Sequence, residues 1–172
     1  RVAVFKVALA GLAAPQAAEA ARKAMADDQK KIDETHILLI LALLTSSGHG
    51  TMGYDLPAAI GAKIANPDAT VICFVGDGSL QMNIQELATI VERVQDIKIV
   101  VLDNHALSLV AQFQRQNWKS HPSTGDKYNP DCAAIAAAYG IAAVTVNTIK
   151  GMREKIAEAV NWPGKVLLHC HV

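Results

Sequence analysis

From Thr70 onward, continuous apolar runs alternate with stretches whose apolar residues recur at helical spacing. The continuous runs are short and rich in β-branched residues, which is typical of strands buried on both faces of a sheet. Strands are expected at 69–75, 97–102, 141–146 and 166–172, and helices at 84–94, 132–139 and 149–160. This alternation predicts an α/β fold, a parallel sheet with helices on both faces.

Three polar or glycine positions mark the predicted helix ends. Asn83 is placed to cap the start of the helix at 84–94, and Asp131 to cap the alanine-rich helix that follows it. Gly140 is expected to stop that second helix, because glycine readily adopts the left-handed conformation that ends helices.

The first 44 residues are less regular. Residues 15–31 predict a helix with a proline in its first turn, and residues 36–44 predict a strand that runs directly into Thr45-Ser46-Ser47-Gly48. The polar segment 117–129 is interpreted as a mobile loop. No second domain is indicated.

Composition narrows the class of partner. Sixteen basic and sixteen acidic residues cancel, and neither sign forms a block, so nucleic acid and membrane surfaces are not expected as partners. Residues 36–44 are too short to span a bilayer. Three dispersed cysteines in apolar surroundings (Cys73, Cys132 and Cys170) indicate reduced core residues of a cytoplasmic protein. The chain begins at Arg1 rather than at a methionine, which favours a processed or excised piece.

The chemically informative motif is Gly76-Asp77-Gly78-Ser79, which links a predicted buried strand to a helix. Asn104 follows the next predicted strand. Parallel neighbours bring both loops to the same carboxyl edge of a sheet, where α/β proteins bind ligands. The alternative is a tight strand-to-helix corner without a ligand.

Oxygen ligands at this edge would suit magnesium, which commonly shares its coordination shell with phosphates. Asp77 offers a charged oxygen, Asn104 a neutral one and Ala106 a backbone carbonyl. Backbone N–H groups of Gly78 and Ser79, near a helix start, would meet a diphosphate. The motif therefore predicts a metal–diphosphate site.

The spacing between Gly76-Asp77-Gly78 and Asn104 resembles the signature of thiamine-diphosphate enzymes. GTMGY at 50–54, LPAAIGAK at 56–63 and GDGSLQMNIQELAT at 76–89 look like acetolactate synthase almost letter for letter. The resemblance covers residues 45–172, which would be the diphosphate- and magnesium-binding domain. Residues 1–44 match weakly and are expected to join the same single domain.

The resemblance implies a role for each matched position. Asp77 and Asn104 would bind magnesium through their side chains, and Ala106 through its carbonyl. The Gly50 carbonyl and Met52 N–H would hold the aminopyrimidine, and the Met52 side chain would bend the cofactor; otherwise Met52 fills the core. The cofactor-binding residues would be Gly50, Met52, Gly76, Asp77, Gly78, Ser79, Asn104 and Ala106.

The implied reaction decarboxylates pyruvate and condenses the remainder with a second 2-keto acid. The catalytic glutamate of this family belongs to a separate pyrimidine-binding domain, so no catalytic residue is assigned in this chain. The isolated chain is expected to be inactive, and the enzyme to be an oligomer. The alternatives are a 2-keto acid decarboxylase, a cyclic-dione hydrolase and a binding-only domain.

Three departures from the family stand out. No Gly-Gln loop precedes Thr45, although the family uses one at the diphosphate. Asp103 stands where a second asparagine is frequent, and Ala106 where glycine is common. The sequence of residues 102–105 also resembles that of trihydroxycyclohexanedione hydrolases.

Phe113 lies in a segment that looks like the acceptor-pocket lining of acetolactate synthases, the alternative being a helical core residue at Leu109/Phe113 spacing. His49 and His105 are interpreted as solvated loop residues, with catalysis as the alternative. Structural or loop roles are assigned to the remaining histidines and to both tryptophans, namely His36, His121, His169, His171, Trp118 and Trp162.

Overall fold

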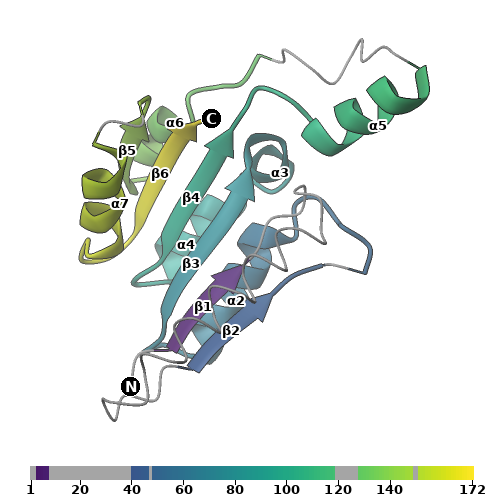
Figure 1. Cartoon of the computed structure of the whole chain (residues 1–172). Coiled ribbons are helices and arrows are strands. Elements are labelled where there is room, and N and C mark those ends of the chain that lie inside the picture. The colour runs from purple at the N-terminus through teal and green to yellow at the C-terminus, as the bar shows by residue number, and fades with distance from the viewer. Residues whose placement is uncertain (1–2, 8–39, 47, 119–127, 149–150) are drawn as a thin grey trace, which may run out of the picture.

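The computed structural model describes residues 3–7, 40–46, 48–118, 128–148 and 151–172. The described strands form one six-stranded, all-parallel sheet in the order β2-β1-β3-β4-β6-β5 (Figure 1). Their bounds are β1 Ala3–Val7, β2 Ile40–Leu44, β3 Thr70–Gly76, β4 Lys98–Asp103, β5 Ala142–Val146 and β6 Val166–His171. The predicted α/β class with a parallel sheet is confirmed.

The four strands predicted after residue 69 all form, within one or two residues of the expected ends. Of the strand predicted at 36–44, the described part is β2. β1 was not predicted, and it inserts between β2 and β3. The predicted helix at 15–31 lies outside the described residues, as does most of the predicted loop at 117–129.

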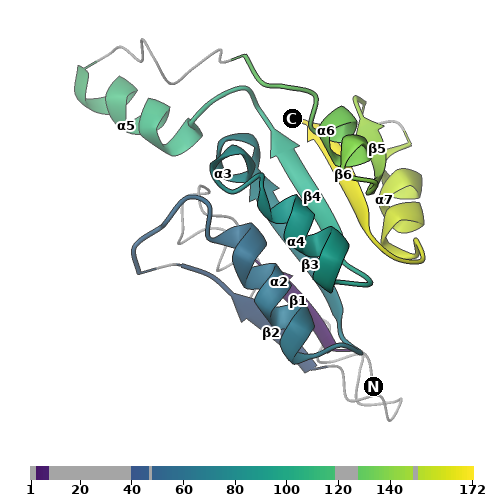
Figure 2. The ribbon, with the colours of Figure 1, turned by 180° about the vertical axis from the view of Figure 1, so that it is seen from behind.

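Helices cover both faces of the sheet. Their bounds are α2 Asp55–Ala65, α3 Asp77–Met82, α4 Glu86–Arg93, α5 Ser108–Trp118, α6 Cys132–Ala138 and α7 Met152–Val160. On one face, α2, α3, α4 and α6 share a core cluster with alternate residues of β3 such as Val71 and Val75, and the rear view shows α2 and α4 in front of the strands (Figure 2). On the other face, α7 packs its Ala159 in a cluster with Val100 and Leu168.

The predicted helix ends met different outcomes. The Asp131 side chain accepts hydrogen bonds from Ala133 N and Ala134 N, and Gly140 follows α6 with φ +78°, so both predictions are confirmed. The Asn83 cap was wrong. The helix expected at 84–94 forms as α4, and α3 before it was not predicted; the Asn83 Nδ2 atom, instead of capping α4, donates to the Gly53 carbonyl at 2.6 Å.

The three cysteines are buried and free, as predicted. Burial raises the pKa of each thiol, to about 11 for Cys132, which keeps them protonated and unreactive at neutral pH. Among the helices of the described ranges, none is long and apolar enough to cross a bilayer.

The carboxyl ends of β3, β4 and β6 meet at one edge, where their arrowheads point in Figure 1. In the register, Gly76 is the partner of Leu102, and Asp103 is the partner of His171. The glycine motif, the asparagine loop and the end of the last strand therefore share this edge.

Candidate functional site

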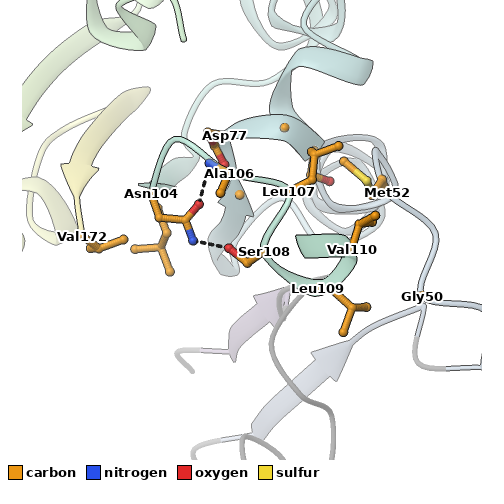
Figure 3. A pocket seen from close by; sticks show the side chains of 14 residues that line it. Gly50, Met52, Asp77, Asn104, Ala106, Leu107, Ser108, Leu109, Val110 and Val172 are labelled. Atoms are coloured by element: carbon orange, nitrogen blue, oxygen red, sulfur yellow. Dashed lines mark hydrogen bonds between the residues drawn. The ribbon is translucent and has the colours of Figure 1, made fainter. Parts of the chain in front are cut away.

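A cavity of about 260 Å³ opens at this edge, and we call it the first cavity (Figure 3). Each of the eight residues predicted to bind the cofactor lines it: Gly50, Met52, Gly76, Asp77, Gly78, Ser79, Asn104 and Ala106. They come from the loop before α2, from the end of β3, from α3 and from the loop after β4. Residues separated by more than fifty positions in sequence thus converge on one cavity, which Phe113 does not line.

The loop that carries Gly50 and Met52 is locked onto α3 by buried hydrogen bonds. Gly53 N donates to the Ser79 Oγ at 2.7 Å, and Ser79 Oγ donates to the Asp55 Oδ2 at 2.6 Å. Gly53 has φ +82°, and a Cβ there would lie 2.7 Å from Asn83 Nδ2. The Ser79 hydroxyl therefore holds the loop, and only its backbone N–H remains available for the role predicted for this residue.

Gly78 lies where three segments meet. A Cβ on Gly78 would lie 2.5 Å from Leu107 Cδ2 and 3.2 Å from Met52 Cε. Figure 3 shows the Met52 and Leu107 side chains next to each other on this side of the cavity. A larger residue would have to displace the end of the Leu107 side chain and crowd that of Met52, and both side chains line the cavity.

Two acidic residues meet at the motif. The Asn129 Nδ2 donates to Asp77 Oδ2 and, at 2.7 Å, to Asp103 Oδ1, so one amide joins both carboxylates. Gln81 Nε2 donates to Asn129 Oδ1 at 3.1 Å and orients that amide. Burial, and then repulsion from Asp103, raises the pKa of Asp77 despite this hydrogen bond. A cation beside Asp77 would relieve this cost.

Asp103 is buried, but several hydrogen-bond donors contact its carboxylate. Burial alone would raise its pKa, but hydrogen bonds from His169, the His105 N–H and Asn129 outweigh burial and lower the pKa of Asp103. His169 Nε2 lies 2.8 Å from Asp103 Oδ2. The two carboxylates are therefore unequal: hydrogen bonds lower the pKa of Asp103, whereas burial leaves the pKa of Asp77 raised.

The Asn104 side chain forms hydrogen bonds with residues that follow it in the chain. Its Oδ1 accepts from Ala106 N at 3.1 Å, and its Nδ2 donates to Ser108 Oγ at 2.5 Å (Figure 3). An amide oxygen has two lone pairs, so this hydrogen bond leaves one for a metal ion. Asn104 and Asp77 line the same cavity, as the predicted metal site requires.

Sequence reasoning missed part of this edge. Asn129 was placed in a polar loop, and His169 and His171 were assigned structural roles, yet all three lie beside Asp103. A signal for Asn129 existed, because a helix that returns from a strand's carboxyl edge begins there, and Asn129 precedes α6. The two histidines depended on β6 lying next to β4, which chain order does not reveal.

The remaining candidates lie away from the first cavity's lining. His49 is exposed, and the His105 side chain is half-exposed with a left-handed backbone at φ 55°. Phe113 is 56% exposed and packs edge-to-face on Trp118, which is 65% exposed. The core-residue alternative for Phe113 was therefore wrong.

Comparison with known proteins points in the same direction as the geometry. Residues 36–170 match the family model described as "Thiamine pyrophosphate enzyme, C-terminal TPP binding domain". The chain is 45% identical over 131 residues to the acetolactate synthase large subunit of Cyanidium caldarium, covering 75% of this chain and 22% of that protein. It is 45% identical over 133 residues to the acetolactate synthase isozyme 1 large subunit of Escherichia coli (strain K12), covering 75% and 23%. The chain thus spans less than a quarter of these relatives.

Proposed function

The chain belongs to the thiamine pyrophosphate enzymes, as a C-terminal TPP binding domain, and from this premise we propose that it is the diphosphate- and magnesium-binding part of an acetolactate-synthase-like enzyme. The observation that carries the proposal is the convergence of eight predicted residues on the first cavity. The single domain would run from 45 to 172 together with the weakly matched residues 1–44. A decarboxylase or cyclic-dione hydrolase has no comparable support among the named relatives.

The donor set of the first cavity fits the proposed ligands. Asp77 is buried, has a raised pKa and shares a hydrogen-bonding amide with a second carboxylate, so a divalent cation would stabilise its charged form. Oxygen atoms of Asp77, Asn104 and the Ala106 carbonyl would complete the protein's part of a magnesium shell. Backbone N–H groups at the start of α3 would bind the diphosphate.

When bound, thiamine diphosphate supplies the carbon nucleophile and electron sink for decarboxylating a 2-keto acid. This chain's residues bind and orient. Met52, held against Gly78 and Leu107, would support the bend of the cofactor, and the Gly50 carbonyl would position the aminopyrimidine. No residue of the first cavity is proposed to move a proton, and the glutamate for that step would come from the partner domain.

The partner would be a pyrimidine-binding domain of the same or another subunit, acting on small 2-keto acids. The first cavity holds about 260 Å³, below the roughly 300–1,000 Å³ usual for a complete small-molecule site, as suits a surface that binds one end of a cofactor. α5 projects from the sheet with Leu109, Val110 and Phe113 exposed (Figures 1 and 2). Such an apolar helix face suits burial in an oligomer.

The test is reconstitution. The chain alone should form no acetolactate from pyruvate, and adding a pyrimidine-binding domain from an acetolactate synthase should restore acetolactate formation that depends on magnesium and thiamine diphosphate. Turnover by a monomeric sample of the chain alone would refute the proposal that the catalytic glutamate comes from a partner domain. Cofactor binding without acetolactate formation by the reconstituted pair would leave the binding-only alternative.

A further inference from the structure

A second cluster of chemically active side chains lies at the carboxyl edge, outside the first cavity. One carboxylate oxygen of Asp103 and one ring nitrogen each of His169 and His171 lie within 4.8 Å of one another. His169 and His171 are two residues apart on β6 and so share a face, and Asp103 is the register partner of His171. The sheet itself therefore aims all three at one point.

These residues line a second cavity of about 510 Å³, which shares no lining residue with the first. The division arises at the end of β4 and in the loop that follows it, where Leu102, Asn104 and Ala106 face the first cavity and Asp103 and His105 face the second. His171 is 37% exposed, so an ion could enter from solvent.

An unpartnered buried atom gives an independent indication of a ligand. The His169 side chain is 3% exposed, and its Nδ1 is buried without a hydrogen-bond partner among the described residues. Asp131 Oδ1 is 3.5 Å from this Nδ1. Buried ring nitrogens are normally satisfied, so an orphan of this kind needs an explanation.

In the chain without a metal, the Nε2–H of His169 donates to Asp103, which leaves the lone pair of Nδ1 facing the Asp131 carboxylate. A metal ion at Nε2 would replace that hydrogen and move the ring's hydrogen to Nδ1. A metal-bound histidine typically donates its remaining N–H to a carboxylate, which fixes the tautomer and raises the ligand's basicity. With an ion at His169 Nε2, the Nδ1 would carry the hydrogen and face Asp131. The His169 ring does lie between the two carboxylates, with Nδ1 facing Asp131 and Nε2 facing Asp103.

The donor set selects the class of ion. Two imidazoles and one carboxylate suit zinc and similar divalent transition metals, whereas magnesium prefers oxygen ligands alone. Ligand atoms around a tetrahedral zinc ion lie about 3.4 Å apart for bonds of about 2.1 Å. The Asp103 Oδ2 is 2.8 Å from His169 Nε2 and 3.9 Å from His171 Nδ1, on either side of that spacing. Small side-chain rotations would close the site.

We propose that Asp103, His169 and His171 bind one divalent transition-metal ion of the zinc class, with Asp131 as a positioning residue for His169. The site is separate from the proposed magnesium site and does not depend on the proposed function. Its open side, toward His105 and the solvent, leaves room for a water molecule or a further ligand.

Zinc chloride titrated calorimetrically into the full chain should show one saturable equivalent, and cobalt(II) should give a d–d absorption band of a nitrogen-containing site. His171→Gln should weaken zinc binding at least about tenfold, because loss of even an outer partner costs about 10–100-fold. His49→Gln, an exposed histidine outside the second cavity, is the matched control and should bind as the unmodified chain does.

Asp131→Asn provides a second test that does not depend on how His171→Gln folds. Asparagine caps helices as well as aspartate, so a purely structural Asp131 predicts unchanged zinc affinity. If Asp131 orients His169, Asp131→Asn should lower the zinc affinity by about tenfold. Absence of saturable binding, equal zinc affinity in His171→Gln and His49→Gln, unchanged affinity in Asp131→Asn, or displacement of zinc by millimolar magnesium would each overturn the proposal.

Discussion

Asp103 and Asn104 are adjacent in the chain but line two different cavities. Asn104 shares the first cavity with Asp77, and Asp103 shares the second with His169. The two cavities are nevertheless linked, because Asn129 donates to both Asp77 and Asp103. One amide side chain thus couples the proposed magnesium site to the histidine cluster.

Removing this amide should destabilise the chain in a pH-dependent manner. Asn129→Ala leaves two buried carboxylates without their shared donor, at a cost of about 1–3 kcal/mol in the free energy of unfolding. Hydrogen bonds that lower the pKa of Asp103 stabilise the fold above the ordinary pKa of aspartate, and this contribution is lost as pH falls through the lowered folded value. Urea unfolding should therefore show a larger cost at about pH 7 than at about pH 3.

Asn161→Ala is the matched control, since its Nδ2 donates to the exposed Ala157 carbonyl and, among the described residues, to no carboxylate. An Asn129→Ala cost that is the same at both pH values, or no larger than that of the control, would contradict the link between the carboxylates.

Without a bound cation, the charged Asp77 carboxylate should destabilise the folded chain. Its pKa is raised above the ordinary 3.8, first by burial, so its charged form costs stability as pH rises above that value. Asp77→Asn removes this charge and should raise the melting temperature of the metal-free chain near neutral pH, by about 2–4 °C per kcal/mol gained. The gain should vanish in acid, where Asp77 is already protonated. A destabilised Asp77→Asn in metal-free buffer at pH 7 would refute this.

Gly78→Ala should impair ligand binding more than folding. The added methyl displaces the flexible end of Leu107 toward the first cavity, while alanine improves the intrinsic helix propensity of α3 by about 1 kcal/mol. Thiamine diphosphate affinity, measured by calorimetry with magnesium present, should fall by about tenfold or more, and Leu107→Ala in the same chain should recover part of it. Gly61→Ala, where no atom lies within 4 Å, is the control. Failure of the double variant to recover affinity would exclude the steric explanation.

Phe113→Trp should alter product ratio without altering fold or cofactor affinity. Phe113 is 56% exposed, so its replacement should change stability by no more than about 0.5 kcal/mol. In the assembled enzyme, the larger ring would contact the extra methyl of 2-ketobutyrate, and one methylene is worth about 1–3 kcal/mol of discrimination. The acetohydroxybutyrate-to-acetolactate ratio should rise. An unchanged ratio would remove Phe113 from the acceptor pocket.

Most of the sheet was predictable because strands buried on both faces leave continuous apolar runs, as in β3 and β4. β1 escaped prediction because five residues, Ala3–Val7, carry too little periodic signal. The helix at 84–94 was predicted, but its Asn83 cap was not formed, because the Asn83 side chain is bound to the Gly53 carbonyl by tertiary structure.

The first cavity was predictable for a related reason. Asp77 and Asn104 follow strands that are neighbours both in sequence and in the sheet, so β3 and β4 bring them together directly. Gly50 and Met52 follow β2, which does not border β3, and only the family resemblance predicted their place. The second cavity was not, because β6 lies between β4 and β5, and only that order brings His171 beside Asp103. Local patterns do not encode the order of strands.

The most direct test of the central claim is thermal unfolding of the chain with magnesium and thiamine diphosphate. A ligand at 100 times its dissociation constant adds about 2.7 kcal/mol of stability, which corresponds to a rise of about 5–10 °C for a chain of this size. The unmodified chain and Asp68→Ala, an exposed aspartate control, should both show the rise, and Asp77→Ala should not. A rise in Asp77→Ala equal to that of the unmodified chain would contradict the assignment of Asp77 to the metal and, with it, the proposed cofactor site.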